Sequence, residues 1–355
     1  MDLSCPPRYF HNKNKEGEVV VSTYNSQKIS RKGISYAHFG YIFALPFALA
    51  FLIFSLYPII YTVVIGFTDL KGLGNTHFNF LEDPFMNFKN ILTSEIFLTA
   101  LGNTFLIWIV NFIPQILLAL LLTAWFTDTR TNIKGQGFFK VMFYMPNIIT
   151  AASIAVLFNA FFAQPVGPMN SILEMIHNAR GIEEKFVPTN FFVDKTTTRG
   201  IVAFIQFWMW YGNTMIMLIS GVLGINPAIF EAAEIDGSSR WQTFFKITLP
   251  CIKTILLYVL VTSMIGGLNM YDIPKLLQNG GPDNSTLTTS MYIQAQAFAG
   301  SYMYNRAAAA SMIMFVIIMI LTACLFFILR DGDEVAAKKL KKQARKEQRL
   351  AEKGM

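Results

Sequence analysis

Long apolar stretches separated by short polar segments dominate the pattern of this 355-residue chain. A helix needs about 20 consecutive apolar residues to cross the hydrocarbon core of a bilayer. Six segments reach that length, at about residues 38–66, 97–126, 141–163, 200–224, 253–272 and 306–329. The pattern therefore predicts an all-α, polytopic membrane protein with six transmembrane helices, some of them long enough to tilt in the bilayer.

Basic residues are divided unevenly between the two sides of these predicted helices. Six spans put both termini on one side, and that side carries 21 of the 29 Lys and Arg residues. Loops with an excess of Lys and Arg face the cytoplasm. We therefore expect both termini and the loop between the fourth and fifth spans to be cytoplasmic. Because the positive charge gathers at the two ends and in short loops, the net charge of +7 does not indicate a nucleic-acid partner.

The polar segment of residues 226–250 has its own local pattern. Asn226 followed by Pro227 is a helix-start signal, because the Asn side chain caps a first turn and the Pro ring fits that turn. Residues 228–236 then form a short helix. Gly237 ends it, since glycine enters the left-handed region without steric cost.

The second half of this segment predicts another short helix. Either Ser238 or Ser239 is suited to cap it, and it ends near Thr248. Pro250 lies where the next membrane helix begins. The segment is therefore expected to form a short helix, a bend and a second short helix, with the small side chains at 232–233 allowing another surface to approach closely.

Ionisable residues are almost absent from the interiors of the six spans, and Asp272, at the end of the fifth span, is the exception. An ion-coupled carrier usually holds carboxylates there, so the pattern argues against secondary transport and against a charged substrate. The polar groups are neutral amides accompanied by aromatic rings, namely Asn103, Asn111, Gln115, Asn147, Gln206, Asn213 and Asn269 with Trp208, Trp210, Tyr211 and Tyr271. These groups suit an uncharged, polyhydroxylated ligand, although each also serves in helix packing or as an interfacial anchor.

Motifs for nucleotide or metal chemistry are missing from the sequence. No G-x-x-x-x-G-K-[ST] loop is present, so ATP must be used by a partner subunit. The three cysteines, Cys5, Cys251 and Cys324, have no metal-binding spacing, and the four histidines are scattered. We expect this chain to bind no cofactor and no metal, and to be no enzyme.

Several motifs, in their order along the chain, carry a resemblance to a known family. The 226–250 segment reads E-A-A, three residues, Gly, nine residues, Ile, one residue, Leu-Pro. The other motifs are LYPIIY at 56–61, ALGNT at 100–104, the segment 138–146, and YDI at 271–273 followed by NGGP at 279–282. Together they resemble the carbohydrate ABC importer permeases of the maltose and multiple-sugar type over about residues 40–330. The chain departs from the family pattern at Met270 and at 277–279.

The resemblance implies the type I ABC importer permease fold, in a multi-pass protein of the bacterial cytoplasmic membrane. It also implies the partners: a second permease subunit, usually non-identical, two ATPase subunits and an extracytoplasmic sugar-binding protein. The 226–250 segment would be the coupling loop, which sits in a cleft of the ATPase and transmits its motion. The function implied is ATP-driven import of a neutral sugar or oligosaccharide.

Site residues follow from the resemblance in the same way. The ATPase-coupling residues would be Glu231, Ala232, Ala233, Asp236, Gly237, Ile247, Leu249 and Pro250. Sugar contacts would come from the spans flanking the loop, and the substrate-pathway residues would be Tyr211, Asn213, Asn269 and Tyr271.

The expected organisation has four parts. Residues 1–37 form a disordered cytoplasmic segment, 38–96 the first transmembrane helix and an outer loop, and 97–329 a five-helix permease core that contains the 226–250 segment. Residues 330–355 form a basic cytoplasmic tail, either solvated or lying near anionic lipid.

Two alternatives remain at this point. One is an ion-coupled secondary carrier or channel, which would need charge inside the spans. The other is an ABC permease for another solute, such as glycerol phosphate or a polyamine. A phosphate would require Arg or Lys facing the pathway, and a polyamine would require acidic residues.

Overall fold

The structure is a computed structural model that describes residues 37–329, except Thr129, Asn132, Glu183 and Ser301, together with two short strands. These strands, β1 (Asn12–Lys13) and β2 (Val19–Val20), pair in antiparallel fashion. Apart from the strands and residue 37, the expected N-terminal segment 1–37 lies outside the described residues. The basic tail 330–355 also lies outside them.

The chain divides into two units, Met1–Pro58 and Ile59–Met355. In the first unit, α1 (Ala37–Phe51) continues into the π-helical turn η1 (Leu52–Leu56), in which no residue is buried. The helix then continues as α2 (Tyr57–Gly66). The 28 residues of Phe39–Gly66 are long and apolar enough to cross a membrane, which agrees with the first predicted span.

Four further helices of the second unit are also long and apolar enough to cross a membrane. They are α4 (Glu95–Thr127), α8 (Lys195–Leu223), the run Lys253–Gln278 that contains α12 (Lys253–Leu268) and α13 (Asp272–Gln278), and α15 (Tyr304–Leu329). They coincide with four of the predicted spans. The prediction of a helical, polytopic membrane protein is therefore confirmed.

The predicted span at 141–163 is broken. It consists of α5 (Gln136–Ile148) and α6 (Ala151–Phe161), which meet at an angle of 91°. Ile149 and Thr150 have extended backbones, and the Thr150 hydroxyl accepts a hydrogen bond from the Ser153 N–H at 3.3 Å. Thr150 therefore caps a new helix within an apolar run, and this cap is why one straight span does not form.

The remaining helices are short. They are α3 (Met86–Leu92), α7 (Pro168–Ala179), α9 (Pro227–Ile235), α10 (Arg240–Thr243), the π-turn η2 (Phe244–Thr248), α11 (Leu249–Cys251) and α14 (Thr289–Phe298).

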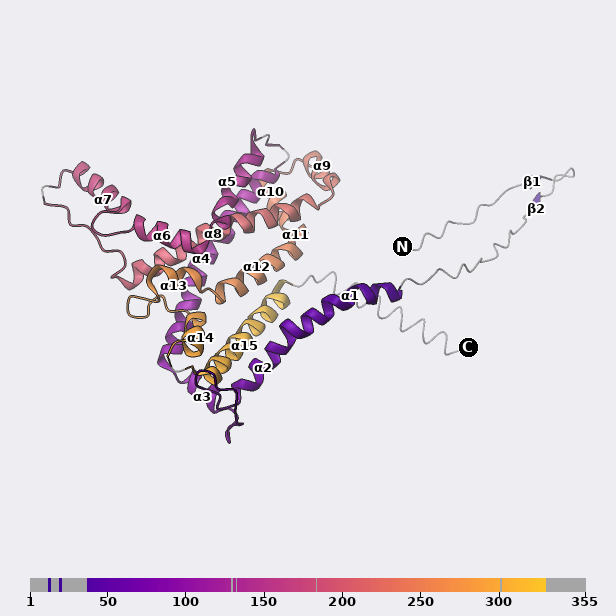
Figure 1. Cartoon of the computed structure of the whole chain (residues 1–355). Coiled ribbons are helices and arrows are strands. Elements are labelled where there is room, and N and C mark those ends of the chain that lie inside the picture. Colours follow the sequence, from indigo (N-terminus) through magenta and orange to yellow (C-terminus); the bar gives the residue numbers. More distant parts are fainter. Residues whose placement is uncertain are drawn as a thin grey trace. The chain divides into compact units, whose positions relative to one another are not determined.

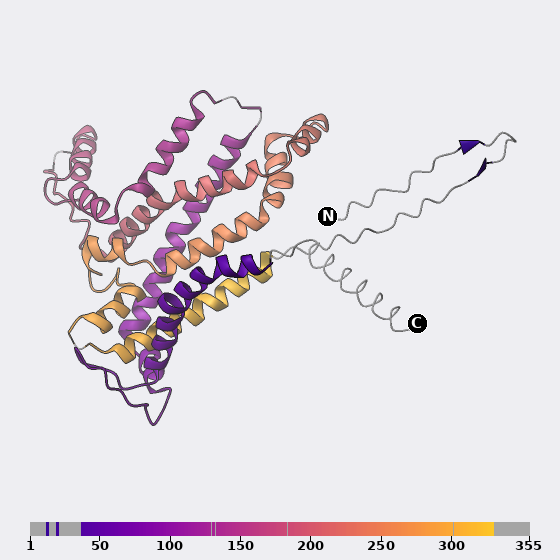
Figure 2. The same cartoon turned by 45° about the vertical axis from the view of Figure 1, so that its right-hand side comes forward.

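Helix α4 is the longest element of the second unit, at 33 residues. It packs along α8, and α12 and α14 also contact it. In Figure 1 it runs from the region of α3 and α14 to the region of α5 and α10. Figure 2 shows the same helices turned by 45°. Helix α4 thus connects two groups of short elements that lie at its opposite ends.

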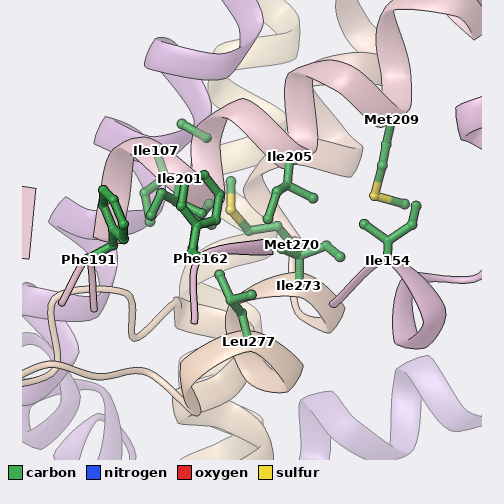
Figure 3. Packing of buried hydrophobic residues seen from close by; sticks show 12 residues of the cluster. Ile107, Ile154, Phe162, Phe191, Ile201, Ile205, Met209, Met270, Ile273 and Leu277 are labelled. Carbon is green, nitrogen blue, oxygen red and sulfur yellow. The ribbon is translucent and has the colours of Figure 1, made fainter. Parts of the chain in front are cut away.

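The main apolar core holds the bent pair in place. Ile154 and Phe162 from the α6 region pack with Ile201 and Ile205 of α8 and with residues of α13 (Figure 3). Helix α8 presents a buried face at Ile201, Val202, Ile205 and Met209, which have the three- and four-residue spacing of one helix side. The second arm of the broken span is therefore fixed against α8 and α13.

Candidate functional site

The 226–250 segment has the predicted helix–bend–helix form. Asn226 Oδ1 accepts a hydrogen bond from the Ala228 N–H at 3.1 Å, and Pro227 is in the first turn of α9. Gly237 has φ +70°, in the left-handed region. The Gly237 N–H donates to Glu234 O, and the Ser238 N–H donates to Ala233 O, each at 3.0 Å. This pattern is a Schellman motif, so Gly237 ends α9 as expected.

A capping box starts the second helix. The Ser239 hydroxyl accepts from the Gln242 N–H at 3.3 Å, and Gln242 Oε1 accepts from the Ser239 N–H at 2.9 Å. Of the two serines predicted as caps, Ser239 is therefore the one used. The helical path continues from α10 through η2 into α11 and ends at Cys251, three residues beyond the predicted end near Thr248, and the part from Phe244 to Thr248 is a π-turn.

The eight predicted coupling residues differ in exposure. Ala233 is buried, Ile247 and Leu249 are half-buried, and Glu231, Ala232, Asp236, Gly237 and Pro250 are exposed. Within the described part of the chain, the Glu231 carboxylate has no ion pair or hydrogen bond. Ile235 lies one helical turn from Glu231 and is 87% exposed. The exposed side of α9 therefore combines an acid, a small residue and a large apolar side chain.

The segment is joined to the end of α4 by two ion pairs. Arg240 Nε lies 3.0 Å from Asp128 Oδ2, and Arg130 Nε lies 3.2 Å from Glu234 Oε1. In the sequence these charged residues lie in two loops that were predicted to be cytoplasmic, and nothing in the sequence indicates that they meet. More than 100 residues separate the partners, which are therefore brought together only by the packing of α4 against its neighbours.

A hollow of about 430 Å³ lies beside these ion pairs. It is lined by the end of α4 and by the 226–250 segment, through Leu121, Leu122, Ala124, Trp125, Thr127, Asp128, Arg130, Phe230, Glu234, Arg240, Trp241, Thr243, Phe244 and Thr248. Its walls are largely apolar, and the charged residues among them are paired with one another.

A second hollow, of about 270 Å³, lies between α4, α8 and α12. It is lined by Asn111, Gln115, Gln206, Trp210, Asn213, Thr214, Met217, Val259, Thr262, Ser263, Gly266, Gly267 and Met270. None of these lining residues is charged. Amides and hydroxyls next to an indole ring are the groups that hydrogen-bond and stack on an uncharged polyhydroxylated ligand.

The polar side of this second hollow is partly occupied by internal hydrogen bonds. Gln115 Nε2 donates to Thr214 Oγ1 at 2.8 Å, and Asn111 Nδ2 donates to the Ile107 carbonyl at 2.8 Å. Within the described residues, the Gln206 and Asn213 side chains have no hydrogen-bond partner. Among the described residues, these two amides, the Ser263 hydroxyl and the Trp210 indole N–H are therefore free to bind a ligand there.

The four predicted substrate-pathway residues are not gathered in one place. Asn213 lines the second hollow, whereas Tyr211, Asn269 and Tyr271 are not among its lining residues. Tyr211 is buried against Phe143. Asn269 ends α12, with Nδ2 donating to the Ile265 carbonyl at 2.8 Å, and Tyr271 precedes α13.

The spacing of four residues on α8 is a signal in the sequence from which this hollow could have been predicted. Gln206, Trp210, Asn213 and Met217 follow the spacing of one side of a helix, and all four line it. This stripe lies on α8 beside the buried apolar face of the same helix. A polar stripe on a long apolar helix indicates a surface that faces something other than lipid.

The motif at 100–104 and the loop that follows the motif at 279–282 meet near the Glu95 end of α4. Asn103 Nδ2 donates to the carbonyls of Asn284, at 2.6 Å, and Leu287, at 3.1 Å. Arg199 Nη2 donates to Asn103 Oδ1 at 2.7 Å, and Arg199 Nε donates to the Ser285 carbonyl at 2.9 Å. The loop after Gly280 and Gly281 is therefore held to both α4 and α8.

Comparison with known proteins finds one matching family and several relatives that align over most of the chain. Residues 99–332 match the family described as binding-protein-dependent transport system inner membrane component. The arabinooligosaccharides transport system permease protein AraP of Bacillus subtilis (strain 168) is 30% identical over 275 residues, which cover 76% of this chain and 81% of AraP. The lactose transport system permease protein LacF of Rhizobium radiobacter is 29% identical over 261 residues, covering 73% of this chain and 83% of LacF.

A solved structure shares the fold. It is that of a bacterial alginate ABC transporter in complex with an alginate pentasaccharide-bound periplasmic protein. The matching chain aligns with a TM-score of 0.67 at 24% identity, over 82% of this chain and 94% of that chain.

Proposed function

Because this chain belongs to the family of binding-protein-dependent transport system inner membrane components, we propose that it forms the pathway for a neutral sugar or oligosaccharide. It is a permease subunit of an ABC importer in the inner membrane, and the ATPase is a separate chain. Family membership decides against the ion-coupled carrier. The identity of the solute and the roles of individual residues belong to the proposal.

The observation that carries the substrate class is the hollow between α4, α8 and α12. Its lining residues are uncharged, and Gln206 and Asn213 have no partner among the described residues. A phosphate ester would need Arg or Lys there, and a polyamine would need carboxylates. The names of the relatives, which are permeases for lactose and for arabinooligosaccharides, support the same class.

In the proposed arrangement, both termini and the 226–250 segment are cytoplasmic. The exposed side of α9, with Glu231, Ala232 and Ile235, enters a cleft of the ATPase. ATP binding closes the ATPase pair, and the segment conveys that movement to the spans. The assembly contains a second permease subunit, usually non-identical, two ATPase subunits and an extracytoplasmic sugar-binding protein. ATP binds the partner subunits and not this chain.

Uptake by the complex reconstituted in proteoliposomes tests this proposal. The complex is purified with its own ATPase, second permease and binding protein, and is offered radiolabelled lactose, arabinotriose, maltotriose and diacetylchitobiose. Glycerol phosphate and a polyamine serve as charged comparators. The proposal predicts ATP-dependent uptake of at least one neutral sugar and of neither charged solute. Uptake of a charged solute alone, or of a sugar without ATP, would contradict it.

A further inference from the structure

Two ion pairs join the end of α4 and the turn after it to the 226–250 segment. We propose that Asp128, Arg130, Glu234 and Arg240, called here the clamp, fix the segment to α4 so that α4 moves with it. Through the clamp, α4 would transmit the conformational change of the ATPase across the membrane. This inference rests on the proposed coupling function of the segment.

The Asp128 carboxylate is held by hydrogen bonds within its own turn as well as by Arg240. Asp128 follows the last turn of α4, and its Oδ1 accepts from the Arg130 N–H at 3.1 Å. Its Oδ2 accepts from the Thr131 hydroxyl at 3.0 Å and lies 3.0 Å from Arg240 Nε. The Asp128 side chain is only 16% exposed. A carboxylate fixed by its own turn forms a directed contact, because little side-chain freedom remains to be lost.

The two pairs hold both sides of the bend at Gly237. Glu234 lies on α9, before the bend, and Arg240 is the first residue of α10, after it. Their partners, Asp128 and Arg130, lie two residues apart. The polarity is also reversed between the pairs, since an acid at 128 meets a base and a base at 130 meets an acid. Each helix of the segment therefore has its own fixed partner at the end of α4.

Helix α4 reaches from the clamp to the far side of the fold. Asn103 and Asp128 are about 25 residues apart, which corresponds to about 37 Å along a helix. At the far end, Asn103 holds the carbonyls of Asn284 and Leu287 and accepts from Arg199. A displacement of α4 by the clamp would therefore shift the loop after Gly281 and the start of α8 together.

Neutralising one charge should loosen this link without unfolding the protein, because partly exposed ion pairs contribute little to folding stability. The variants are Asp128→Asn and Arg240→Gln, with the charge-retaining Arg240→Lys as the rescue variant, made in the assembled complex. Asp83→Asn is the matched control, since it removes an exposed ion pair with Lys89, at 2.6 Å, in a different loop.

Two readouts separate a transmission role from a merely structural one. The first is the number of ATP molecules hydrolysed per molecule of the sugar that the wild-type complex imports. The second is the distribution of distances between nitroxides at Leu117 of α4 and Ile229 of α9, both exposed, with Cys5, Cys251 and Cys324 replaced by serine. It is measured with and without ATP and vanadate, and it needs no sugar.

Asp128→Asn and Arg240→Gln should each raise ATP use per sugar at least threefold and broaden the distance distribution, at unchanged amounts of assembled complex. Arg240→Lys, which keeps the charge that faces Asp128, should leave both close to wild type, and Asp83→Asn should change neither. Wild-type values for both Asp128→Asn and Arg240→Gln, or an Arg240→Lys variant that fails as Arg240→Gln does, would overturn the clamp. If the wild-type complex imports no sugar in the panel, the substrate proposal fails, and the nitroxide distances alone then decide for or against the clamp.

Discussion

Gly212 of α8 lies directly against the main-chain carbonyl of Phe143 in α5. A Cβ at Gly212 would overlap that oxygen, and it would lie 3.0 Å from the Tyr144 Cα. Main-chain atoms cannot turn away as a side chain does, so the contact requires glycine. It holds the first arm of the broken span against the helix that carries the polar stripe of the second hollow.

Gly212→Ala should therefore separate α5 from α8 and destabilise the protein by about 1–3 kcal/mol, the usual effect of overpacking. Gly200→Ala is the control on the same helix, because nothing lies within 4 Å of a Cβ there. That variant should be neutral or stabilise by about 0.5–1 kcal/mol, since alanine favours a helix over glycine. Thermal unfolding in detergent measures both. Equal Tm values for the two variants would contradict the close contact.

The bend at Gly237 gives a second prediction. A Cβ at Gly237 has open space, yet φ is +70°, so a substitution is strained by the backbone and not by a neighbour. Gly237→Val should disturb the bend and lower ATP-driven uptake while membrane insertion continues. Gly237→Asn should keep most of the uptake, because Asn tolerates the left-handed region. Full uptake by the Val variant would remove the bend from the coupling mechanism.

Asn213 and Asn269 were both predicted to contact substrate, but only Asn213 lines the second hollow. Asn213→Ala should weaken sugar uptake, with a higher KM and unchanged assembly, because it removes an amide free to bind hydroxyls; the loss of such a hydrogen bond corresponds to about 0.5–1.5 kcal/mol. Asn269→Ala should affect uptake less, since the Asn269 amide already donates a hydrogen bond to the Ile265 carbonyl. Asn178→Ala, on the exposed surface of α7, is the control. A larger effect at Asn269 than at Asn213 would move the pathway away from this hollow.

The start of α8 provides a prediction about pH. The Asp194 carboxylate accepts from the Thr197 N–H at 2.7 Å and from its hydroxyl at 2.8 Å, and these bonds hold the pKa of Asp194 below its ordinary value. A lowered pKa in the folded state means that the charged cap stabilises the fold above the ordinary value of 3.8. This contribution is lost as the pH falls through the lowered pKa.

Asp194→Ala should accordingly reduce the Tm at neutral pH. The difference from wild type should shrink as the pH falls below about 3.8, and once Asp194 is protonated it should level off at the smaller contribution of the neutral cap. Thermal unfolding over a pH series measures this difference. A difference that stays constant down to the lowest pH would show that the charge of Asp194 does not support the helix.

Helix existence and the local form of the 226–250 segment were predictable because both depend on neighbouring residues. Apolar length fixes the spans, and Asn226, Gly237 and Ser239 fix the ends of short helices by local hydrogen bonds. The break at Thr150 was missed because its cap lies within an otherwise apolar run. The hydrogen bond that a single hydroxyl forms in such a run cannot be predicted from the residues around it.

The parts that could not be predicted depend on distant residues. Asp128 meets Arg240, and Asn103 meets Arg199 and Asn284, only after α4 has packed against α8. The second hollow also needs three helices at once, so single amides such as Asn213 and Asn269 looked equivalent in the sequence. Local pattern identifies the elements, whereas the site emerges from the packing between them.

Cross-linking from Ile235 shows whether α9 contacts the ATPase. Ile235 is 87% exposed on α9, beside the proposed coupling residues. In the assembled complex, the Ile235→Cys variant, with its native cysteines replaced by serine, is treated with a cross-linker that carries a maleimide at one end and a photoreactive diazirine at the other, and is then illuminated. We expect a covalent product with the ATPase subunit and loss of ATP-driven uptake. Modification of this cysteine in intact cells by a maleimide that cannot cross the membrane would contradict it.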